Sequence, residues 1–287
     1  MSISRPTQDG QWTSVIRPKS GWLDINMREA WHYRDLVMMF VQRDLVAQYK
    51  QTILGPLWYA IQPILSTLVF TLVFSKIARI PTDSMPPFLF YMAGTVAWSY
   101  FANCLTTTSS VFVTNASIFG KVYFPRICVP VATVTSNLLT FLIQFCLFLG
   151  FCAYFKVVGV PIKFTAVAWL LPLFVLQMAL LGLGFGILVS SLTTKYRDLT
   201  FLVSFGVQLW MYATPIVYPL SIIPEKYRIW FLLNPMTSII QGFRAACLGT
   251  GTITPSYIAA GWVLTIAVLC LGIVLFSRIE KTFMDTV

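Results

Sequence analysis

The chain has 287 residues, of which 57% are hydrophobic and only 10% are charged, and its mean hydropathy is +0.76. A soluble domain normally carries about a quarter of charged residues, so this composition excludes a soluble protein and indicates an integral membrane protein. The formal net charge is +10, but the basic residues are spread among short loops, which argues against a nucleic-acid-binding module and favours contact with membrane lipids.

Residues 1–21 predict a flexible cytoplasmic tail. Their charged residues leave no apolar run, so we expect no signal peptide. Prolines and glycines interrupt the polar sequence, which is typical of a loosely ordered segment. The N-terminus is therefore expected to stay in the cytoplasm.

Residues 22–53 predict two cytoplasmic interface helices, over Met27–Tyr33 and about Asp35–Tyr49. The apolar side of the second helix contains Met38, Met39, Leu45, Val46 and Tyr49, and its other side contains Arg43, Asp44, Gln48 and Lys50. This pattern predicts an amphipathic helix that lies along the membrane interface. An ordinary surface helix is the alternative.

Residues 54–287 predict an all-α transmembrane domain with six transmembrane helices. Six charge-free stretches reach the roughly 20 residues that a membrane-spanning helix needs. The predicted spans are Leu54–Ser75, Phe88–Val113, Ile127–Phe155, Phe164–Leu192, Leu199–Tyr218 and Tyr257–Phe276. An even number of crossings places both termini in the cytoplasm, and a modest excess of Lys and Arg on that side agrees with this orientation.

Neutral polar residues form a stripe on the second span. The stripe consists of Asn103, Thr107, Ser110 and Thr114, whose spacing places them on one helical face. Polar side chains are unfavourable against lipid, so this face is expected to point at protein or at a water-filled cavity. Both a conduit wall and ordinary helix packing remain open. On the fourth span, Gly182, Gly186 and Ser190 predict a closely packed helix pair.

The connection between spans five and six predicts a re-entrant hairpin at the outer face. Its two apolar pieces are each too short to cross a membrane, and Asn234-Pro235 divides them. We expect short helices over about Glu225–Leu233 and Pro235–Leu248, because proline suits a first helical position. Such backbone is tolerated at membrane depth only where protein or water satisfies its polar groups. An amphipathic loop on the membrane surface is the alternative.

The sequence contains almost no groups for catalysis. His32 is the single histidine and lies in the charged N-terminal segment, and none of the acidic residues falls inside a predicted span. The six cysteines have no close pairing and are expected to be apolar core residues. No phosphate-binding GxxxxGK[ST] motif is present. We therefore expect neither an enzyme nor an ion-coupled transporter nor an ATPase.

Several short motifs lie in a fixed order around the predicted spans. They include Tyr33-Arg34-Asp35, Leu54-Gly55-Pro56-Leu57-Trp58, Phe124-Pro125-Arg126, Lys195-Tyr196-Arg197-Asp198, Thr214-Pro215 and Asn234-Pro235-Met236. Together they resemble ABC-2-type permeases that export cell-surface polysaccharides, in the branch of O-antigen, capsule and teichoic-acid exporters.

The resemblance implies an inner-membrane homodimer that moves lipid-linked polysaccharide outward and binds no nucleic acid. Energy would come from two copies of a separate ABC ATPase, which would carry ATP and Mg, whereas this chain would hold no cofactor. An ABC-2 drug or lipid exporter is the nearest alternative. A membrane-embedded enzyme acting on lipid-linked sugars is the alternative from another class.

The resemblance also suggests three groups of functional residues. The ATPase-coupling group contains Arg43, Asp44, Lys50, Lys121, Tyr123, Phe124, Pro125 and Arg126. The conduit-lining group contains Trp58, Tyr59, Asn103, Thr107, Ser110, Trp210 and Tyr212. The outer-gate group contains Pro215, Tyr218, Asn234, Pro235 and Arg244. Local ion pairs or lipid headgroups would equally explain the cations of the first group, and an interfacial aromatic belt would explain the rings of the second.

Overall fold

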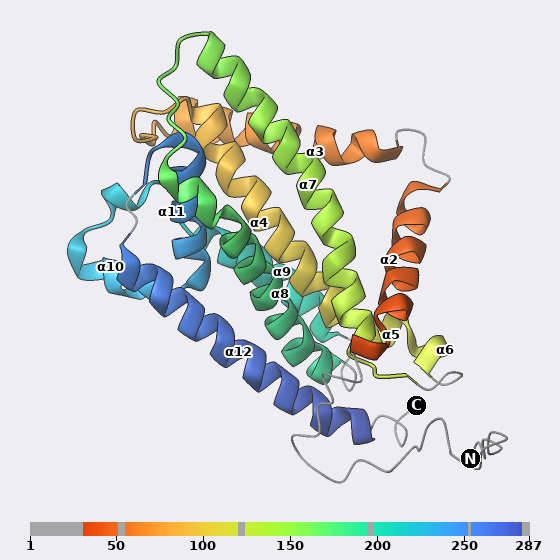
Figure 1. The fold of residues 1–287 in the computed structure, drawn as a ribbon. Helices are drawn as coiled ribbons and strands as arrows, with labels where there is room; N and C mark the ends of the chain where they lie inside the picture. Colours follow the sequence, from red (N-terminus) through yellow and green to blue (C-terminus); the bar gives the residue numbers. More distant parts are fainter. Residues whose placement is uncertain (1–30, 51–54, 120–123, 194–197, 252–253, 283–287) are drawn as a thin grey trace, which may run out of the picture.

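A computed structural model describes residues 31–50, 55–119, 124–193, 198–251 and 254–282. Within these ranges the fold is all-helical and contains no strand (Figure 1). The α-helices are α2 (Arg34–Tyr49), α3 (Trp58–Phe70), α4 (Pro87–Ser109), α5 (Val111–Thr114), α6 (Ala116–Phe119), α7 (Cys128–Val157), α8 (Leu171–Thr193), α9 (Leu199–Ala213), α10 (Glu225–Leu232), α11 (Pro235–Leu248) and α12 (Pro255–Thr282). Three 3₁₀ turns, Gly55–Leu57, Ala166–Leu170 and Leu220–Ile222, and a π-helical stretch, Thr71–Ile77, complete the described elements.

Four stretches of the described residues are long and apolar enough to cross a membrane. They are Trp58–Ile77, Cys128–Val157, Ala166–Thr193 and Pro255–Ser277. Each agrees with a predicted span to within a few residues at both ends. The other two predicted spans correspond to α4 and α9, which do not meet both conditions. Helix α4 has the length but contains many polar residues, and α9 is apolar but has only 15 residues.

Helix α9 ends earlier than the sequence pattern predicts. The predicted span continues to Tyr218, whereas the helix stops at Ala213. Thr214 has an extended backbone, with φ −100° and ψ 142°. It precedes Pro215, and the proline ring disfavours the helical conformation of the residue before it. A charge-free stretch therefore contains both a helix and the irregular segment that follows it.

Helix α4 also ends before the predicted boundary at Val113. Its last residue is Ser109, and a separate turn, α5, follows. Ser and Thr hydroxyls crowd this end and donate to carbonyls of their own helix, as Ser109 does to Thr106 and Ser110 does to Thr107. Such bonds compete with the helical ladder and favour a break. Thr193 of α8 donates its hydroxyl to the Ser109 carbonyl at 2.6 Å, so the acceptor freed at the break is satisfied.

Helix α4 lies at the centre of the bundle and packs against α7 and α8, and α12 covers another side of α8. The contact between α4 and α8 depends on glycines. A Cβ atom added at Gly182 would lie 2.6 Å from Cys104 Cβ, and one added at Gly186 would overlap with Thr108. These positions confirm the prediction that the small residues of the fourth span allow close helix packing.

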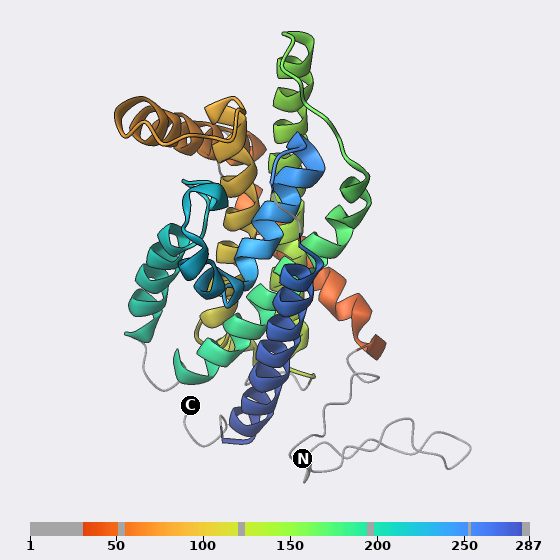
Figure 2. The same ribbon diagram turned by 90° about the vertical axis from the view of Figure 1, so that its left-hand side faces the viewer.

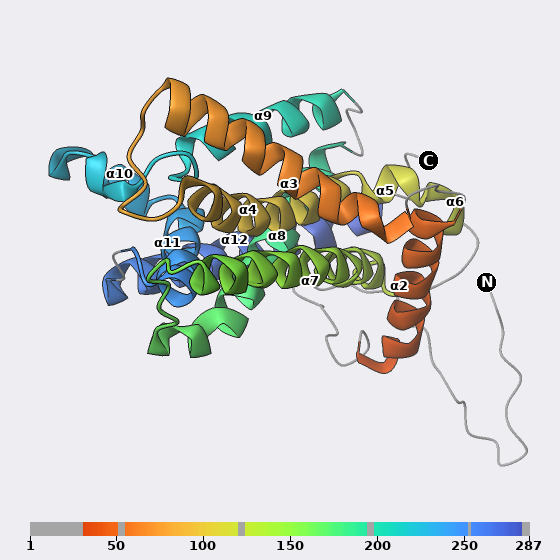
Figure 3. The same ribbon diagram turned by 90° about the horizontal axis from the view of Figure 1, so that it is seen from above.

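The two ends of the bundle carry different short helices. Helices α2, α5 and α6 lie at one end, and α10 and α11 lie at the other (Figures 1 and 3). Helices α3 and α9 lie on the outside of the bundle, on the same side (Figure 2). In α9 only Val207 is buried, so this helix leaves most of its apolar surface exposed.

Helix α2 confirms that a helix covers the predicted residues Asp35–Tyr49, but its buried side is not the predicted apolar side. Its buried side chains are Phe40 and Val41, which face the bundle, whereas Met38, Met39 and Val46 are more than half exposed. The helix therefore has one apolar side against protein and further apolar side chains on the outside, which suits a position at a lipid surface. Most of the predicted first helix, Met27–Tyr33, lies outside the described residues.

Candidate functional site

The predicted coupling residues and the predicted outer-gate residues lie at opposite ends of the bundle. The coupling residues that the structure describes belong to α2 and to the segment before α7, and the outer-gate residues surround α11. Lys121 and Tyr123 lie outside the described residues. Four described conduit residues, Trp58, Tyr59, Trp210 and Tyr212, belong to α3 and α9, and the other three belong to α4 and its C-terminal end.

An aromatic cluster joins the described coupling elements to one another. The ring of Phe40 on α2 lies 5.6 Å from Phe124, and Phe124 stacks on Phe119 of α6 at 5.7 Å. Phe112 of α5 continues the cluster and stacks on Phe276 of α12 at 5.0 Å. These rings belong to one buried cluster, so α2, the Phe124–Arg126 segment and the end of α12 form a single packed unit.

Arg126 lies inside this unit. It is 8% exposed, and its guanidinium carbon lies 5.9 Å from the centre of the Phe119 ring. Pro125 beside it is also buried. Arg126 therefore contributes to packing within the chain, whereas Lys50 is exposed at the end of α2. Of these residues, Lys50 is the one whose position suits an ion pair with another subunit.

Arg43 and Asp44 form an ion pair on α2. The Nε and Nη2 atoms of Arg43 both donate to Asp44 Oδ1, at 2.9 Å and 2.7 Å. The guanidinium carbon also lies 4.8 Å from the centre of the Phe40 ring. The predicted local ion pair is therefore present, and it neutralises both charges at the surface of the helix.

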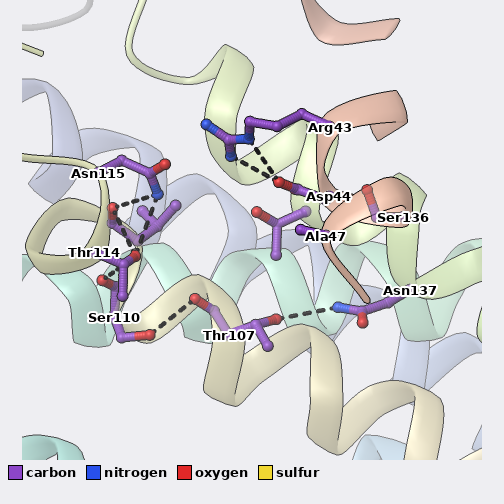
Figure 4. Close-up of a pocket in the computed structure, with 11 residues that line it drawn as sticks. Arg43, Asp44, Ala47, Thr107, Ser110, Thr114, Asn115, Ser136 and Asn137 are labelled. Carbon is purple, nitrogen blue, oxygen red and sulfur yellow. Dashed lines mark hydrogen bonds and ion pairs between the residues drawn. The ribbon is translucent and has the colours of Figure 1, made fainter. Parts of the chain in front are cut away.

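A pocket of about 340 Å³ separates this ion pair from the bundle (Figure 4). Its wall comes from α2, from α4 with the turn after it, and from α7. The lining residues are Arg43, Asp44, Ala47, Thr107, Ser110, Val111, Thr114, Asn115, Thr133, Ser136 and Asn137. Asn137 donates its amide to Thr107 Oγ1 at 3.1 Å and so connects α7 to α4. The pocket thus brings Thr107, Ser110 and Thr114 of the predicted stripe together with two predicted coupling residues.

The predicted conduit residues do not form one continuous surface within the described chain. Trp210 is partly buried and packs against the core, with its ring 5.1 Å from Phe101 and 5.1 Å from Phe185. Trp58 and Tyr212 are exposed, Tyr59 is half-buried, and Asn103 is exposed outside the pocket. Trp210 therefore serves core packing in the single chain.

Four of the five predicted outer-gate residues meet at the start and middle of α11. Asn234 caps the helix, because its side-chain oxygen accepts from Met236 N at 3.1 Å. Its amide nitrogen donates to Thr214 Oγ1 at 2.9 Å, which ties the cap to the break after α9. Pro235 occupies the first helical position, as predicted. Tyr218 lies further out and donates its hydroxyl to the Tyr212 carbonyl at 3.1 Å.

Arg244 holds the centre of this arrangement. Its side chain is 1% exposed and donates to the carbonyls of Pro215 at 2.8 Å, Ile216 at 2.6 Å and, more weakly, Phe90 at 3.4 Å. Its guanidinium carbon lies 3.5 Å from the centre of the Phe90 ring. A buried cation is tolerated because carbonyl dipoles and a ring face replace its water. Arg244 therefore connects α11, α4 and the segment after α9.

Sequence reasoning missed several residues of both places. Phe90 and Thr214 have no pattern that predicts contact with α11, since they lie far from it in the chain. For the pocket a signal was present: Thr133, Ser136 and Asn137 share the helical spacing of the stripe on α4. Two such stripes on neighbouring helices predict a common polar wall.

Comparison with known proteins adds an independent observation. Residues 35–248 match the family model described as ABC-2 type transporter. The chain is 30% identical over 251 residues to an O-antigen export system permease protein RfbA of Klebsiella pneumoniae, covering 88% of this chain and 94% of that protein. It is 31% identical over 225 residues to the O-antigen export system permease protein RfbA of Myxococcus xanthus, covering 76% and 82%. It is also 23% identical over 262 residues to the capsule polysaccharide export inner-membrane protein CtrC of Neisseria meningitidis, covering 84% and 89%.

Proposed function

The chain belongs to the ABC-2 type transporter family, and we propose from this that it is the permease subunit of a bacterial exporter of lipid-linked polysaccharide. The observation that carries the proposal is the likeness to O-antigen export permeases over 88% of the chain. A drug or lipid exporter would also fit the family model. The relatives whose names specify a glycan cargo favour polysaccharide.

The proposed topology has six crossings and a re-entrant hairpin. Helix α4 would cross at the centre, where it packs against α7 and α8, and α9 would cross together with the extended segment after it. Helices α10 and α11 would form the hairpin at the outer face. All 14 residues of α11 are buried, and its cap and Arg244 satisfy neighbouring polar groups, as backbone at membrane depth requires. Both termini would be cytoplasmic.

Energy for export would come from two copies of a separate ABC ATPase, with ATP and Mg bound there. The coupling surface would be the end of the bundle that carries α2, because the aromatic cluster links this helix to the Phe124–Arg126 segment and to α12. A push on α2 would then reach several helices together. This chain would form the wall of the conduit and would change conformation during export, but it would catalyse no reaction.

A conduit for a hydrated glycan would need two copies of the chain. A bundle whose central helix is buried against its neighbours leaves little room for a sugar chain inside one copy. In a homodimer, exposed rings such as Trp58 and Tyr212 would line the space between the copies. The division into a tail at 1–21, interface helices at 22–53 and a membrane domain at 54–287 belongs to the same proposal.

The proposal is tested by deletion and complementation in the host cell. Cells without the chain should make the polysaccharide but retain it inside, and the wild-type gene should restore it to the surface. The measurement is surface glycan by antibody labelling of intact cells, compared with total glycan in extracts. Unchanged surface glycan in the deletion strain would contradict the proposal. Sugar transfer by the purified chain alone would favour an enzyme.

A further inference from the structure

The pocket between α2, α4 and α7 has a wall of neutral polar groups. Of its 11 lining residues, three are Thr, two are Ser and two are Asn, and the remaining apolar residues are Ala47 and Val111. Its volume of about 340 Å³ falls in the range of small-ligand sites, about 300–1,000 Å³. A partner helix would be too wide for such a pocket, whereas one or two sugar rings would fit.

The hydroxyl groups of the wall already donate hydrogen bonds within the protein. Each hydroxyl that lines the pocket donates to a carbonyl of its own helix: Thr107 to Asn103, Ser110 to Thr107, Thr114 to Ser110, Thr133 to Val129 and Ser136 to Ala132. A hydroxyl oxygen whose proton is bound still offers lone pairs. The wall therefore presents hydrogen-bond acceptors, and a ligand must bring the donors.

The amide groups of the wall have the same character. Asn137 donates to Thr107 Oγ1 at 3.1 Å, and Asn115 donates to Thr114 Oγ1 at 3.2 Å and to the Val111 carbonyl at 3.0 Å (Figure 4). These bonds use both N–H donors of Asn115 and one of the two N–H donors of Asn137. This arrangement leaves few donors for a ligand that can only accept.

The charged residues of the pocket argue against a phosphate as its ligand. Among the described residues that line it, Arg43 is the cation, and two of its nitrogens already donate to Asp44. A phosphate at Arg43 would also meet the Asp44 carboxylate, which repels anions. A sugar ring brings hydroxyl donors, and a carboxylate accepts such donors well.

From these groups we infer that the pocket binds the sugar part of the exported substrate, as a neutral, hydroxylated ligand, before it enters the conduit. The choice of a glycan as the ligand rests on the proposed function. The position of the pocket gives the binding a consequence. A sugar in the pocket would contact α2 and the α4–α7 pair at the same time. Binding would therefore affect the position of α2, the helix that we propose to couple to the ATPase.

Photo-crosslinking in living cells tests the inference with the cell's own glycan. The photoreactive residue p-benzoylphenylalanine replaces either Ala47, which lines the pocket, or Val46, the exposed neighbour on the same helix that does not. After illumination, the purified chain is probed with glycan antibody. We expect a glycan-bearing product with Ala47 replaced and little or none with Val46 replaced. Absence of the product at Ala47, or equal yield at both positions, would overturn the inference.

Mild acid then identifies which part of the substrate the pocket holds. Glycosyl phosphate bonds break in mild acid, whereas the crosslink and the bonds between sugars are more resistant. A crosslink through sugar keeps its glycan signal after this treatment, as we expect. Loss of the glycan with retention of the lipid phosphate would show that the pocket holds the phosphate end, and would overturn the inference.

A matched pair of variants tests the wall itself. Thr114→Val with Thr133→Val removes two acceptor oxygens from the pocket. The control Thr135→Val removes a hydroxyl of α7 that also donates to a carbonyl of its own helix but does not line the pocket. We expect the crosslink at Ala47 to fall about thirtyfold in the double variant, the effect of two typical hydrogen bonds, and to stay unchanged in Thr135→Val. Equal yields in the two variants would overturn the inference.

These outcomes are separate from a failure of the proposed function. The deletion strain reports on that function, since its surface glycan must depend on the chain. If the dependence holds but no crosslink forms at Ala47, only the sugar pocket is wrong. If surface glycan does not depend on the chain, the proposed export function is wrong.

Discussion

At the scale of the residue, Arg244 shows how a break in one helix stabilises another. Pro215 ends α9 and leaves the carbonyls of Pro215 and Ile216 without helical partners. The Arg244 guanidinium donates a hydrogen bond to each of these carbonyls, and its positive charge strengthens both bonds. Arg244 therefore ties α11 to the segment after α9, in addition to the Asn234 cap and the packing of α11 against α4 and α12.

Replacing Arg244 by alanine should destabilise the protein strongly. The substitution leaves buried carbonyls unpaired and a cavity beside Phe90, and each unpaired buried carbonyl costs about 1–3 kcal/mol. We expect a melting temperature several degrees lower for the detergent-purified chain, measured by fluorescence-detected size-exclusion chromatography after heating, and reduced surface glycan. Lys226→Ala, at an exposed cation of α10, is the control and should melt like the wild type. Equal melting of the two variants would contradict the role of Arg244.

The chemistry of this residue was only partly predictable from the sequence. Its placement in the outer-gate group followed from the resemblance. The local sequence could not show its partners, because Arg244 lies between two apolar stretches with no partner nearby in the chain. Its partners lie 28 to 154 residues away. Such contacts depend on how the helices pack, which local patterns do not contain. Arg126 illustrates the same limit, since its burial against Phe119 is invisible in a motif that also suits an exposed loop.

At the scale of the element, the contact between α4 and α8 depends on the absence of side chains. Gly186→Ala should push α8 away from Thr108, because no space exists for the added Cβ. Gly206→Ala on α9 is the matched control, since nothing lies within 4 Å of its position. Alanine favours a helix over glycine by about 0.5–1 kcal/mol, so this control should melt at the same or a slightly higher temperature. A variant at Gly186 that melts as well as the control would contradict close packing at this contact.

The coupling end of the bundle gives a second prediction at this scale. Lys121→Glu should lower surface glycan several-fold while ATP hydrolysis by the assembled complex continues, because a reversed charge opposite an acidic partner surface weakens docking. Lys156→Glu, an exposed lysine in the last turn of α7, carries the same change at the end proposed to face outward and should leave export intact. Surface glycan and phosphate release are measured for both variants. Normal export in Lys121→Glu would remove this residue from the coupling surface.

Arg126 is unsuitable for such a test. Its burial means that Arg126→Glu would place a carboxylate among aromatic rings, where an unpaired charge is costly. Failure of that variant would report misfolding and not lost coupling. The structure therefore changes the best experiment, although Lys121 and Arg126 belong to the same predicted coupling group.

The existence of most elements was predictable because charge-free stretches and caps are local signals. Helix α7 begins and ends close to the predicted residues, α12 begins close to the predicted Tyr257 but continues past the predicted Phe276 to Thr282, and α11 has the predicted first proline. The ends of α4 and α9 were wrong because apolar composition outweighed the local signals. The Ser/Thr run near Ser109 and the Thr214-Pro215 step are both breaks that a count of apolar residues does not register.

At the scale of the whole molecule, the two ends of the bundle have different proposed roles, coupling at one end and gating at the other. The end with α2 carries the aromatic cluster and the polar pocket, and the opposite end carries α11 and Arg244. Helix α4 runs between them and contacts both α7 and α11. A displacement of α2 thus has a continuous packed route to the proposed gate. Which helices are neighbours was not predictable, since a set of apolar segments fits many bundle arrangements.

The proposed homodimer can be tested by mixing copies that work with copies that do not. If export needs both copies, equal co-expression of wild-type chain and Lys121→Glu should leave roughly a quarter of the export, because random pairing in a twofold dimer makes few fully wild-type pairs. A unit with one copy would leave about a half, since each chain would then act alone. Surface glycan is measured at matched total expression, with wild type mixed with Lys156→Glu as the control that should export normally. Export in proportion to the wild-type fraction would contradict a unit in which both copies must act.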